Sequence, residues 1–470
     1  MHSRFYLSLL LVASVVVIVF MWLATDRELS TEYENYQAEY KDYLVKNAKD
    51  EDARKRAARI ETGIRQVYIP ALKKADRCTS CHIGVENPMM AGVGQPFTTH
   101  SGNYLKNHPV AKFGCTICHY GQGRATNKKE AHGGERGVSH WDYPVIPGKY
   151  VQSACGRCHD YKMLADEGME TIVLGEKLFR EKGCLGCHKV NGTGGDLGKA
   201  LDGIGSAALH YFSMGHVKGD LTAYNWIKQH FDDPRAIVPT SEMKVTVSEE
   251  EAVALTTYIF SMRADEVPSK YKLVKNLPVM DRDGASLFQM YCGGCHGDGQ
   301  TSIYDEVFGR TIPAITGSGF VNKIDDTTLR IFIEEGRPGT QMTAWKSNAA
   351  GLKKEEIDKI IGHTTKNRSG ELQQPFNFRE FTSDVGKGKA LYTQRCAFCH
   401  GDDGKGGGRK LGINLKNETV QKMADPEFLA MTVRDGRKDT PMPGFGPDGE
   451  GLSEQDIADV VGYVKTFGRK

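Results

Sequence analysis

Six copies of a five-residue unit, Cys-x-x-Cys-His, together use all 12 cysteines of the chain. Two thiols at this spacing can each add to one vinyl group of a haem, and the histidine that follows can then bind the iron as its proximal ligand. A zinc site or a redox-active cysteine pair leaves the fixed position of the histidine unexplained, and a disulfide framework ignores it. The sequence therefore predicts six covalently attached haem c groups, at Cys78, Cys81 and His82; Cys115, Cys118 and His119; Cys155, Cys158 and His159; Cys184, Cys187 and His188; Cys292, Cys295 and His296; and Cys396, Cys399 and His400.

The composition fits a chain that is built around such cofactors. A length of 470 residues is enough for roughly three domains, yet only 39% of the residues are hydrophobic and 53 are glycine. Each stretch around a motif is too short to form a stable hydrophobic core by itself. A large apolar haem would supply the centre about which short helices and loops pack. The formal net charge of +2 is too small to indicate nucleic acid as a partner.

The N-terminus contains an uncharged and almost entirely apolar run over residues 5–24. A helix of this length crosses the hydrocarbon layer of a bilayer. A cleaved signal peptide is the alternative, but its apolar region is shorter and ends in a small-x-small cleavage site. We therefore expect a retained single-pass anchor over residues 1–27, with the N-terminus inside because Arg4 precedes the run. Haem c is attached outside the bacterial cytoplasmic membrane, so the haem-binding part is expected on the periplasmic side of that membrane.

Residues 28–70 are highly charged and nearly free of glycine and proline, which predicts an amphipathic helix that ends at Pro70. Its apolar and aromatic residues recur at helical spacing. Such a stripe packs either on the chain's own haem-binding part or against a membrane partner, and the sequence leaves both open. The stripe consists of Tyr33, Tyr36, Tyr40 and Tyr43, followed by Ala57, Ile60, Ile64 and Val67.

Three motifs crowd into residues 71–169, which we call the trihaem segment. So few residues per haem cannot build three separate domains, and closely spaced haems make a path for electrons. Histidines outside the motifs are the expected sixth ligands, because a neutral imidazole binds haem iron well. Four candidates serve three irons, so at least one is spare, and Met89 and Met90 are weaker alternatives. The candidates are His100, His108, His132 and His140.

Three related units follow the trihaem segment. Each opens with a helix that carries a Gly-x-x-Leu-aromatic pattern ahead of its motif, and each closes with a helix that begins with acidic residues. A methionine lies in a loop between the two helices. The opening patterns begin at Gly175, Gly284 and Gly388; the closing helices are expected over 248–262, 353–364 and 453–467; and the loop methionines are Met243, Met342 and Met442.

This layout resembles the small class I cytochrome c domain, repeated as domain 1 (170–268), domain 2 (280–366) and domain 3 (384–470). The resemblance implies that Met243, Met342 and Met442 are the sixth ligands of the irons bound by the last three motifs. It also implies a proline whose carbonyl orients the proximal histidine, and Pro313 fits this role in domain 2.

Three departures from this family pattern stand out. In domain 1, Met243 lacks the proline that follows Met442, and His210 or His216 could instead bind a haem of the trihaem segment. In domains 1 and 3, other residues stand where the orienting proline is expected. In domain 2, His363 replaces the aromatic residue of the closing helix, so the helix contact is expected to differ and His363 is expected at the surface.

The expected fold is mainly α: an N-terminal transmembrane helix, a loop-rich trihaem segment and three small all-α class I cytochrome c-like domains. Methionine ligation raises the haem potential relative to two imidazoles, so electrons are expected to run from the trihaem segment outward. The stretch around His108 and the overall layout resemble multihaem cytochrome subunits of quinol-oxidising complexes of the cytochrome bc or alternative complex III type. This implies an electron-transfer subunit, not an enzyme by itself, between a membrane-embedded quinol-oxidising subunit (a b-type cytochrome or similar) and a soluble periplasmic acceptor.

Two alternatives stay open. A multihaem reductase or peroxidase needs one open iron, whereas this chain holds enough histidine and methionine to close all six. A conduit toward extracellular acceptors requires passage across an outer membrane, which the N-terminal anchor does not provide.

Overall fold

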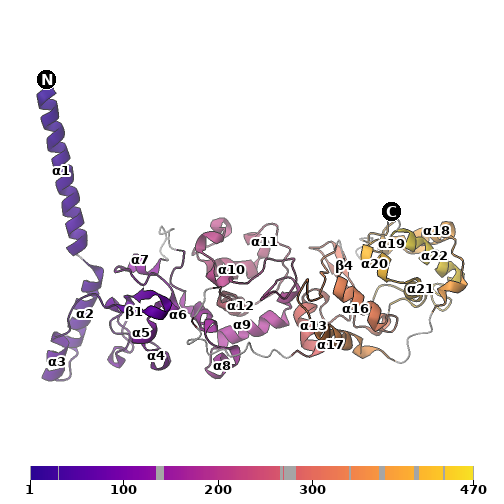
Figure 1. Ribbon diagram of the computed structural model, residues 1–470, viewed down its shortest axis with the longest axis horizontal. Coiled ribbons are helices and arrows are strands. Elements are labelled where there is room, and N and C mark those ends of the chain that lie inside the picture. The colour runs from indigo at the N-terminus through magenta and orange to yellow at the C-terminus, as the bar shows by residue number, and fades with distance from the viewer. Residues whose placement is uncertain are drawn as a thin grey trace. The chain divides into compact units, whose positions relative to one another are not determined.

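The computed structural model describes residues 2–29, 31–133, 142–264, 268, 282–337, 340–369, 376–406, 412–437 and 440–468. The chain forms two compact units (Figure 1). Unit 1 comprises residues 1–158, 207–226 and 266–273, and unit 2 comprises residues 159–206, 227–265 and 274–470. The fold is mainly helical, as predicted. The first stretch of unit 1 ends at Cys158, inside the third motif, which the sequence did not indicate.

Helix α1 (His2–Leu29) contains the apolar run. Its stretch Arg4–Thr25 is long and apolar enough to cross a membrane, and its large apolar side chains are exposed. Exposure of a continuous apolar helix to water is unfavourable, so a bilayer is the environment that suits it. The helix therefore supports membrane anchoring.

The predicted single helix over residues 28–70 is wrong in extent. Two helices, α2 (Glu32–Lys46) and α3 (Glu51–Ala58), are followed by an irregular stretch and by strand β1 (Val67–Ile69). The helix breaks because Asn47 ends α2 and the Asp50 carboxylate accepts the Ala53 N–H at 2.6 Å as the N-cap of α3.

Within unit 1, the tyrosine stripe of α2 packs on the chain's own first motif, which was one of the two possibilities left open. Tyr33 and Tyr40 are buried, and the Asn87 side chain donates to the Tyr40 hydroxyl at 2.9 Å. The fully buried Gln37 amide donates at 2.8 Å to the carbonyl of Ser80, which lies inside the first motif. Helix α2 therefore supports the loop that carries the first haem-attachment site.

The remainder of unit 1 consists of short elements. Strands β1 and β2 (Lys74–Asp76) form an antiparallel hairpin in which Val67 pairs with Asp76 and Ile69 with Lys74. The hairpin places Asp76 beside the first two motifs. Short helices follow the hairpin: α4 (Tyr104–Asn107), α5 (Val110–Phe113), α6 (Thr116–His119) and α7 (Lys128–His132), and the 3₁₀ segment η4 (Gly148–Arg157) runs into the third motif.

Unit 2 contains three pairs of helices, one pair in each predicted domain, and the two helices of each pair pack against each other (Figure 1). All six helices were predicted, and the three closing helices agree with their expected ends to within one residue. The pairs are α9 (Glu170–Glu181) with α12 (Glu249–Ser261), α13 (Gly284–Tyr291) with α17 (Lys354–Thr364), and α18 (Val385–Arg395) with α22 (Glu454–Thr466).

Shorter elements of unit 2 complete the haem-motif turns and the loops. They are α8 (Tyr161–Asp166), α10 (Ala223–Asp232, whose last six residues belong to this unit), α11 (Pro234–Ile237), α14 (Gly293–His296), β3 (Ile303–Asp305), β4 (Arg310–Ile312), α15 (Ser318–Val321), α16 (Asp326–Glu335), α19 (Ala397–His400), α20 (Glu418–Met423) and α21 (Pro426–Asp435).

Each helix pair is held by the same two contacts. A glycine of the opening helix faces a backbone carbonyl of the closing helix so closely that a Cβ atom at Gly175, Gly284 or Gly388 would lie 2.0–2.2 Å from that oxygen. Next to it, an aromatic ring of one helix meets an aromatic ring of the other. The ring centroids are 5.2 Å apart for Phe179 and Tyr258 and 5.4 Å apart for Tyr392 and Tyr463.

Domain 2 keeps this arrangement, which corrects the expectation of a different contact. The His363 ring stands in place of the aromatic residue, with its centroid 5.2 Å from that of Phe288. An imidazole is planar and partly apolar, so it packs on a phenyl ring as the tyrosines do elsewhere. His363 is therefore part of the helix contact.

Two segments do not follow the predicted domain ends. Helix α8 was expected in the trihaem segment, but the Tyr161 hydroxyl lies 3.1 Å from the Ser261 hydroxyl and its ring packs on Tyr258 of domain 1. Residues 207–226 were expected in domain 1, but they belong to unit 1, where the Tyr224 ring stacks on Tyr150 with centroids 5.1 Å apart.

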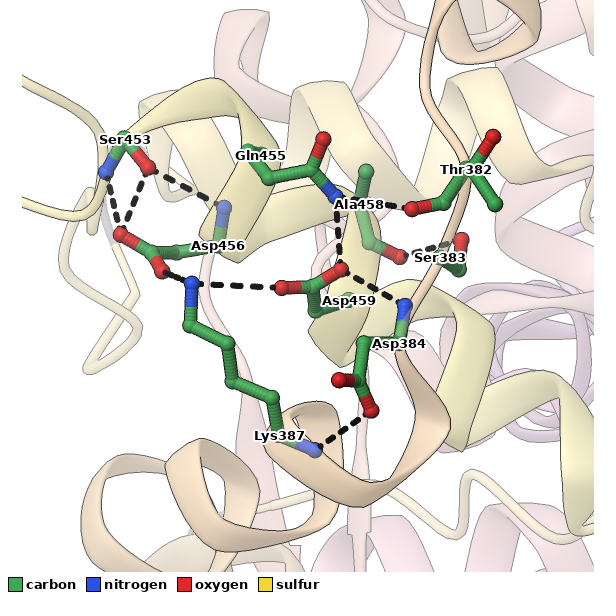
Figure 2. Close-up of polar contacts among 9 residues, drawn as sticks. All are labelled: Thr382, Ser383, Asp384, Lys387, Ser453, Gln455, Asp456, Ala458 and Asp459. Carbon is green, nitrogen blue, oxygen red and sulfur yellow. Dashed lines mark hydrogen bonds and ion pairs between the residues drawn. The ribbon is translucent and has the colours of Figure 1, made fainter.

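In domain 3, polar contacts join the beginnings of α18 and α22 (Figure 2). The Asp384 side chain caps α18 by accepting the Lys387 N–H at 3.0 Å, and the Asp384 N–H donates to Asp459 at 2.9 Å. The Lys387 ammonium lies 2.7 Å from Asp456 and 3.5 Å from Asp459. These contacts fix the two helices at the end where the glycine contact brings them together.

Candidate functional site

The motif histidines of domains 1, 2 and 3 are oriented by backbone carbonyls. The Nδ1 atom of His188 lies 2.8 Å from the Lys199 oxygen, that of His296 lies 3.1 Å from the Pro313 oxygen, and that of His400 lies 3.1 Å from the Ile413 oxygen. Pro313 thus occupies the expected place. Because Nδ1 donates to a carbonyl, Nε2 is left as the ligating nitrogen.

Burial keeps these imidazoles neutral, as metal ligation requires. Burial lowers the pKa of His296 to about 4. It also lowers the pKa of His82, His119, His188 and His400 below the ordinary value.

Two of the predicted distal histidines lie close to motif histidines. The ring centroids of His82 and His132 are 6.1 Å apart, and those of His119 and His100 are also 6.1 Å apart. With metal–nitrogen bonds of about 2.0 Å, two imidazoles on opposite sides of one metal have centroids about 6 Å apart. The geometry therefore fits one iron between each pair.

The other candidates of the trihaem segment lie elsewhere. The Nδ1 atom of His108 is 3.1 Å from the Tyr104 carbonyl oxygen, and His140 lies outside the described residues. Met89 is exposed at the surface, whereas Met90 is fully buried in the core. The distal ligand of the third motif stays a prediction among the histidines.

The third motif and the two histidines of domain 1 differ from the rest. The His159 Nδ1 atom lies 3.2 Å from the Met163 sulfur, not from a carbonyl. His210 is exposed and pairs with Asp142 at 2.8 Å within unit 1, and His216 is also exposed. Neither histidine is placed against a motif histidine by a described contact.

Consecutive attachment sites in unit 1 are in contact. One Asp76 carboxylate oxygen and the sulfurs of Cys78 and Cys115 all lie within 4.8 Å of one another. Asp76 also accepts the N–H groups of Cys115 and Thr116 at 2.7 Å. Burial acts to raise the pKa of Asp76, but the backbone donors outweigh burial and hold the pKa below its usual value. An ionised Asp76 therefore ties the second motif to the first.

The second and third motifs are also neighbours. Burial, followed by the nearby thiols of Cys155 and Cys158, raises the pKa of Cys118 to about 12 in the unattached chain. The Arg157 guanidinium donates to the Ile117 carbonyl at 3.2 Å. Three attachment sites thus follow one another through unit 1.

In unit 2, the fourth and fifth motifs are in contact through Cys187 and Cys295, whose side chains are hydrogen-bonded in the unattached chain. Glycines permit this approach. A Cβ atom at Gly183 would lie 2.4 Å from the Gly294 nitrogen, and one at Gly294 would lie 2.7 Å from the Gly183 oxygen. Gly183 also has φ +68°, which a larger residue rarely adopts.

The fifth and sixth motifs open into one cavity of about 310 Å³. Its wall contains the cysteines and histidines of both motifs together with Met342 and Met442. The structure thus brings Met342 and Met442 to the same cavity as the motif histidines of their domains, although ligation itself stays a prediction.

The three methionine loops share one turn. The Met243 N–H donates to the Ser241 hydroxyl at 3.2 Å, the Met342 N–H to Thr340 at 3.2 Å and the Met442 N–H to Thr440 at 3.3 Å. Met243 therefore occupies the position equivalent to the other two, despite its different neighbours.

His230 is a site residue that the sequence analysis missed. Helix α10 of domain 1 corresponds to helix α16 of domain 2, because both bury two apolar residues four positions apart: Ile227 and Phe231 on α10, and Leu329 and Ile333 on α16. In this alignment, His230 corresponds to Phe332, which lines the cavity that the fifth and sixth motifs share. Burial, followed by the proximity of His188, lowers the pKa of His230 to about 4. The helical spacing from Ile227 to Phe231 was the signal that could have revealed it.

The residues present fit covalently attached haem. Imidazole pairs spaced for one metal, histidines oriented through Nδ1 and an apolar cavity bounded by paired cysteines are what the cofactor needs. The Cys-x-x-Cys-His units would hold the macrocycle and one axial position of each iron.

Comparisons with known proteins agree. Residues 280–363 and 383–464 match the family described as cytochrome c oxidase, cbb3-type, subunit III, and residues 172–263 match the cytochrome c family. The cbb3-type cytochrome c oxidase subunit CcoP of Azospirillum sp. (strain B510) is 26% identical over 200 residues. That alignment covers 39% of this chain and 61% of the relative's length.

A solved structure of a reducing HAO-like protein complex from Kuenenia stuttgartiensis is also similar. The alignment covers 40% of this chain and 96% of that chain, with 18% sequence identity and a TM-score of 0.27. This likeness is too weak to bear on the arrangement of the domains.

Proposed function

We propose that this chain, in which residues 172–263, 280–363 and 383–464 are cytochrome c domains, is the membrane-anchored electron-transfer subunit of a respiratory complex. Covalently bound haem c supplies reversible one-electron chemistry to such domains. We propose one haem at each of the six motifs. Electrons come from a membrane-embedded quinol-oxidising subunit and leave to a soluble periplasmic acceptor, with α1 holding the periplasmic domains at the cytoplasmic membrane.

The observation that carries this proposal is the contact between consecutive attachment sites. Cys78 meets Cys115 in unit 1, Cys187 meets Cys295 in unit 2, and the last two motifs share a cavity. A reductase needs one exposed iron and a substrate pocket, whereas the described contacts join one attachment site to the next within each unit. Contacts between consecutive sites within each unit are what transfer of electrons along that unit requires.

The ligand types support a direction. The imidazole pairs of unit 1 favour low potentials, and the methionines of domains 2 and 3 favour higher ones. Electrons that enter near the membrane anchor would therefore run downhill toward domain 3.

The similarity of domains 2 and 3 to an oxidase subunit favours a second candidate. In this alternative, the chain delivers electrons to a membrane-embedded terminal oxidase. The two candidates share the haem chain and differ in which partner is reduced.

The first experiment is a stepwise redox titration of the detergent-solubilised full chain, followed by low-temperature EPR and by a haem assay. We expect six haems per chain, all of them low-spin. A persistent high-spin haem that binds cyanide or nitrite would contradict the conduit and indicate a reductase.

The second experiment separates the two candidates in isolated membranes. Quinol added under anaerobic conditions should reduce the chain, and a soluble periplasmic acceptor should reoxidise it. If instead a reduced soluble cytochrome reduces the chain and oxygen reoxidises it, the oxidase candidate replaces the first.

A further inference from the structure

Two arginines face the cavity that the fifth and sixth motifs share. Arg337 and Arg437 both line it. Each stands two residues after a helix, α16 or α21, and directly after a glycine whose φ is +62° or +67°. The arginines are therefore equivalent residues of domains 2 and 3.

Each arginine is tied to the methionine of its own domain. The backbone N–H of Arg337 donates to the Met342 carbonyl at 2.9 Å, and the backbone N–H of Arg437 donates to the Met442 carbonyl at 3.0 Å. The glycines allow this closed turn, since a Cβ atom at Gly336 would lie 2.5 Å from the Thr343 backbone. A side chain that starts from this turn is held at a fixed place beside the methionine.

The two guanidinium groups are near each other and poorly compensated. Among the residues that the structure describes, no ion pair joins either arginine to a carboxylate, and the buried Arg337 Nε atom has no hydrogen-bond partner. In the described part of the chain, the Arg437 guanidinium donates to the Ala314 carbonyl at 3.4 Å and lies 4.7 Å from the centroid of the Phe320 ring. Burial lowers the pKa of each to about 10, with Arg310 adding to the effect on Arg337 and Arg337 adding to the effect on Arg437.

A third cation lies at the same junction of domains 2 and 3. The buried Lys323 ammonium of domain 2 donates at 2.6 Å to the carbonyl of Gly436, the residue before Arg437. The nearby Asp435 carboxylate is held by Arg434 at 2.8 Å. Several positive charges thus meet where the described residues supply little negative charge.

Buried cations of this kind need an anionic partner, because removing an unpaired charge from water is costly. A guanidinium binds a carboxylate through two parallel hydrogen bonds, which makes arginine suited to this anion. Haem carries two carboxylate side chains, and the motifs of both domains open into this cavity.

We propose that Arg337 and Arg437 together bind carboxylate groups of the two haems in domains 2 and 3, forming one cluster that couples the two cofactors electrostatically. The inference rests on the proposed function, since it presumes haem at the fifth and sixth motifs. Positive charge beside a haem stabilises its reduced form, so the cluster raises the potentials of both haems.

The test is a redox titration of the full-length protein carrying Arg337→Gln, Arg437→Gln or both. Each single variant should shift the reduction equilibrium of a high-potential haem at least tenfold toward the oxidised form, which is a decrease of about 59 mV. Because one cluster serves both haems, the shift in the double variant should differ from the sum of the single shifts. Unchanged potentials, or strictly additive shifts, would overturn the shared cluster.

Arg395→Gln is the matched control. Arg395 also lines the cavity, but it is half-exposed and lies 3.7 Å from Glu450, so its charge is compensated and screened. Its removal should leave the potentials close to those of the unsubstituted chain. A decrease as large as that of Arg437→Gln would contradict a specific role for the pair.

Two further variants keep the positive charge and control for the possibility that the glutamine variants fail to fold. Arg337→Lys and Arg437→Lys lack the two-pronged donor, so the haem carboxylate bands in resonance Raman spectra should shift while the haem count stays at that of the unsubstituted chain. Unshifted bands would overturn the proposal. Failure of the proposed function would look different, because the unsubstituted chain itself would then show an open, high-spin iron.

Discussion

The trihaem part of unit 1 and the three cytochrome c domains of unit 2 solve the same problem in opposite ways. In unit 1, His132 follows the motif of His82 at a distance, and His100 precedes the motif of His119, so the second pair is nested within the first along the chain. In domains 2 and 3, each methionine follows its own motif and turns back into the same cavity. Nested pairs make one cooperative block, whereas each closed loop makes a separable module.

The cores differ in the same sense. Domain 3 has a core of its own side chains, including Tyr392, Ile457 and Val460. The described part of unit 1 between α2 and the third motif buries only a few large apolar residues, among them Met90 and Ile117. Haem must therefore supply most of the interior of unit 1 but only part of the interior of domain 3.

The largest expected effect comes from deleting one attachment site in each region. Cys115→Ala with Cys118→Ala should lower the haem content of unit 1 by more than one haem, because Asp76 ties the second motif to the first. Cys396→Ala with Cys399→Ala should remove only one haem. Haem content per chain, measured as the pyridine haemochrome, checks both, and a loss of one haem in each case would abolish the contrast.

The next effect comes from exchanging ligand types. Met442→His should lower the potential of the domain 3 haem, and His132→Met should raise that of the first haem, each by a few tenths of a volt on the order set by axial ligands. Redox titration measures both shifts. Met89→Leu is the control, since Met89 is exposed at the surface and should not change any potential. Equal potentials after exchange would mean that these side chains are not ligands.

The repeated parts of unit 2 were the most predictable from the sequence. The Gly-x-x-Leu-aromatic pattern and the acidic start of the closing helices are local signals, and helices α12, α17 and α22 begin within one residue of their expected starts. The pairing of His82 with His132 was not predictable, because it depends on which loop lies across each haem and not on spacing along the chain. For the same reason, the sequence could not assign residues 207–226 to unit 1.

The helix contact common to the three domains gives a smaller and local effect. In Gly388→Ala, the added Cβ atom would lie 2.0 Å from the Asp459 carbonyl oxygen, so the helices must separate. We expect a loss of about 1–3 kcal/mol in the stability of domain 3, measured by denaturant titration of its methionine–iron absorption band.

Gly362→Ala is the control of opposite sign. Gly362 lies within α17 and has open space at the Cβ position, so alanine should stabilise domain 2 by about 0.5–1 kcal/mol. If Gly388→Ala and Gly362→Ala destabilised their domains equally, the loss at Gly388 could not be assigned to its close contact with the Asp459 carbonyl.

The smallest expected effect is pH-dependent and lies at the end of domain 3 shown in Figure 2. The Lys387 ammonium, followed by the Ser453 hydroxyl, holds the pKa of Asp456 below its ordinary value. A carboxylate with a lowered folded-state pKa stabilises the fold above its unfolded pKa of about 3.9 and ceases to do so as the pH falls through the folded value.

Asp456→Asn should therefore lower the Tm of domain 3 by about 2–4 °C at neutral pH and by progressively less below pH about 4. Asp403→Asn removes a more exposed carboxylate whose partner, Lys405, lies in the same loop, so it should shift the Tm less. A decrease in the Asp456→Asn variant that persists unchanged at low pH would assign the effect to the helix cap alone, and not to the ion pair that joins α18 to α22.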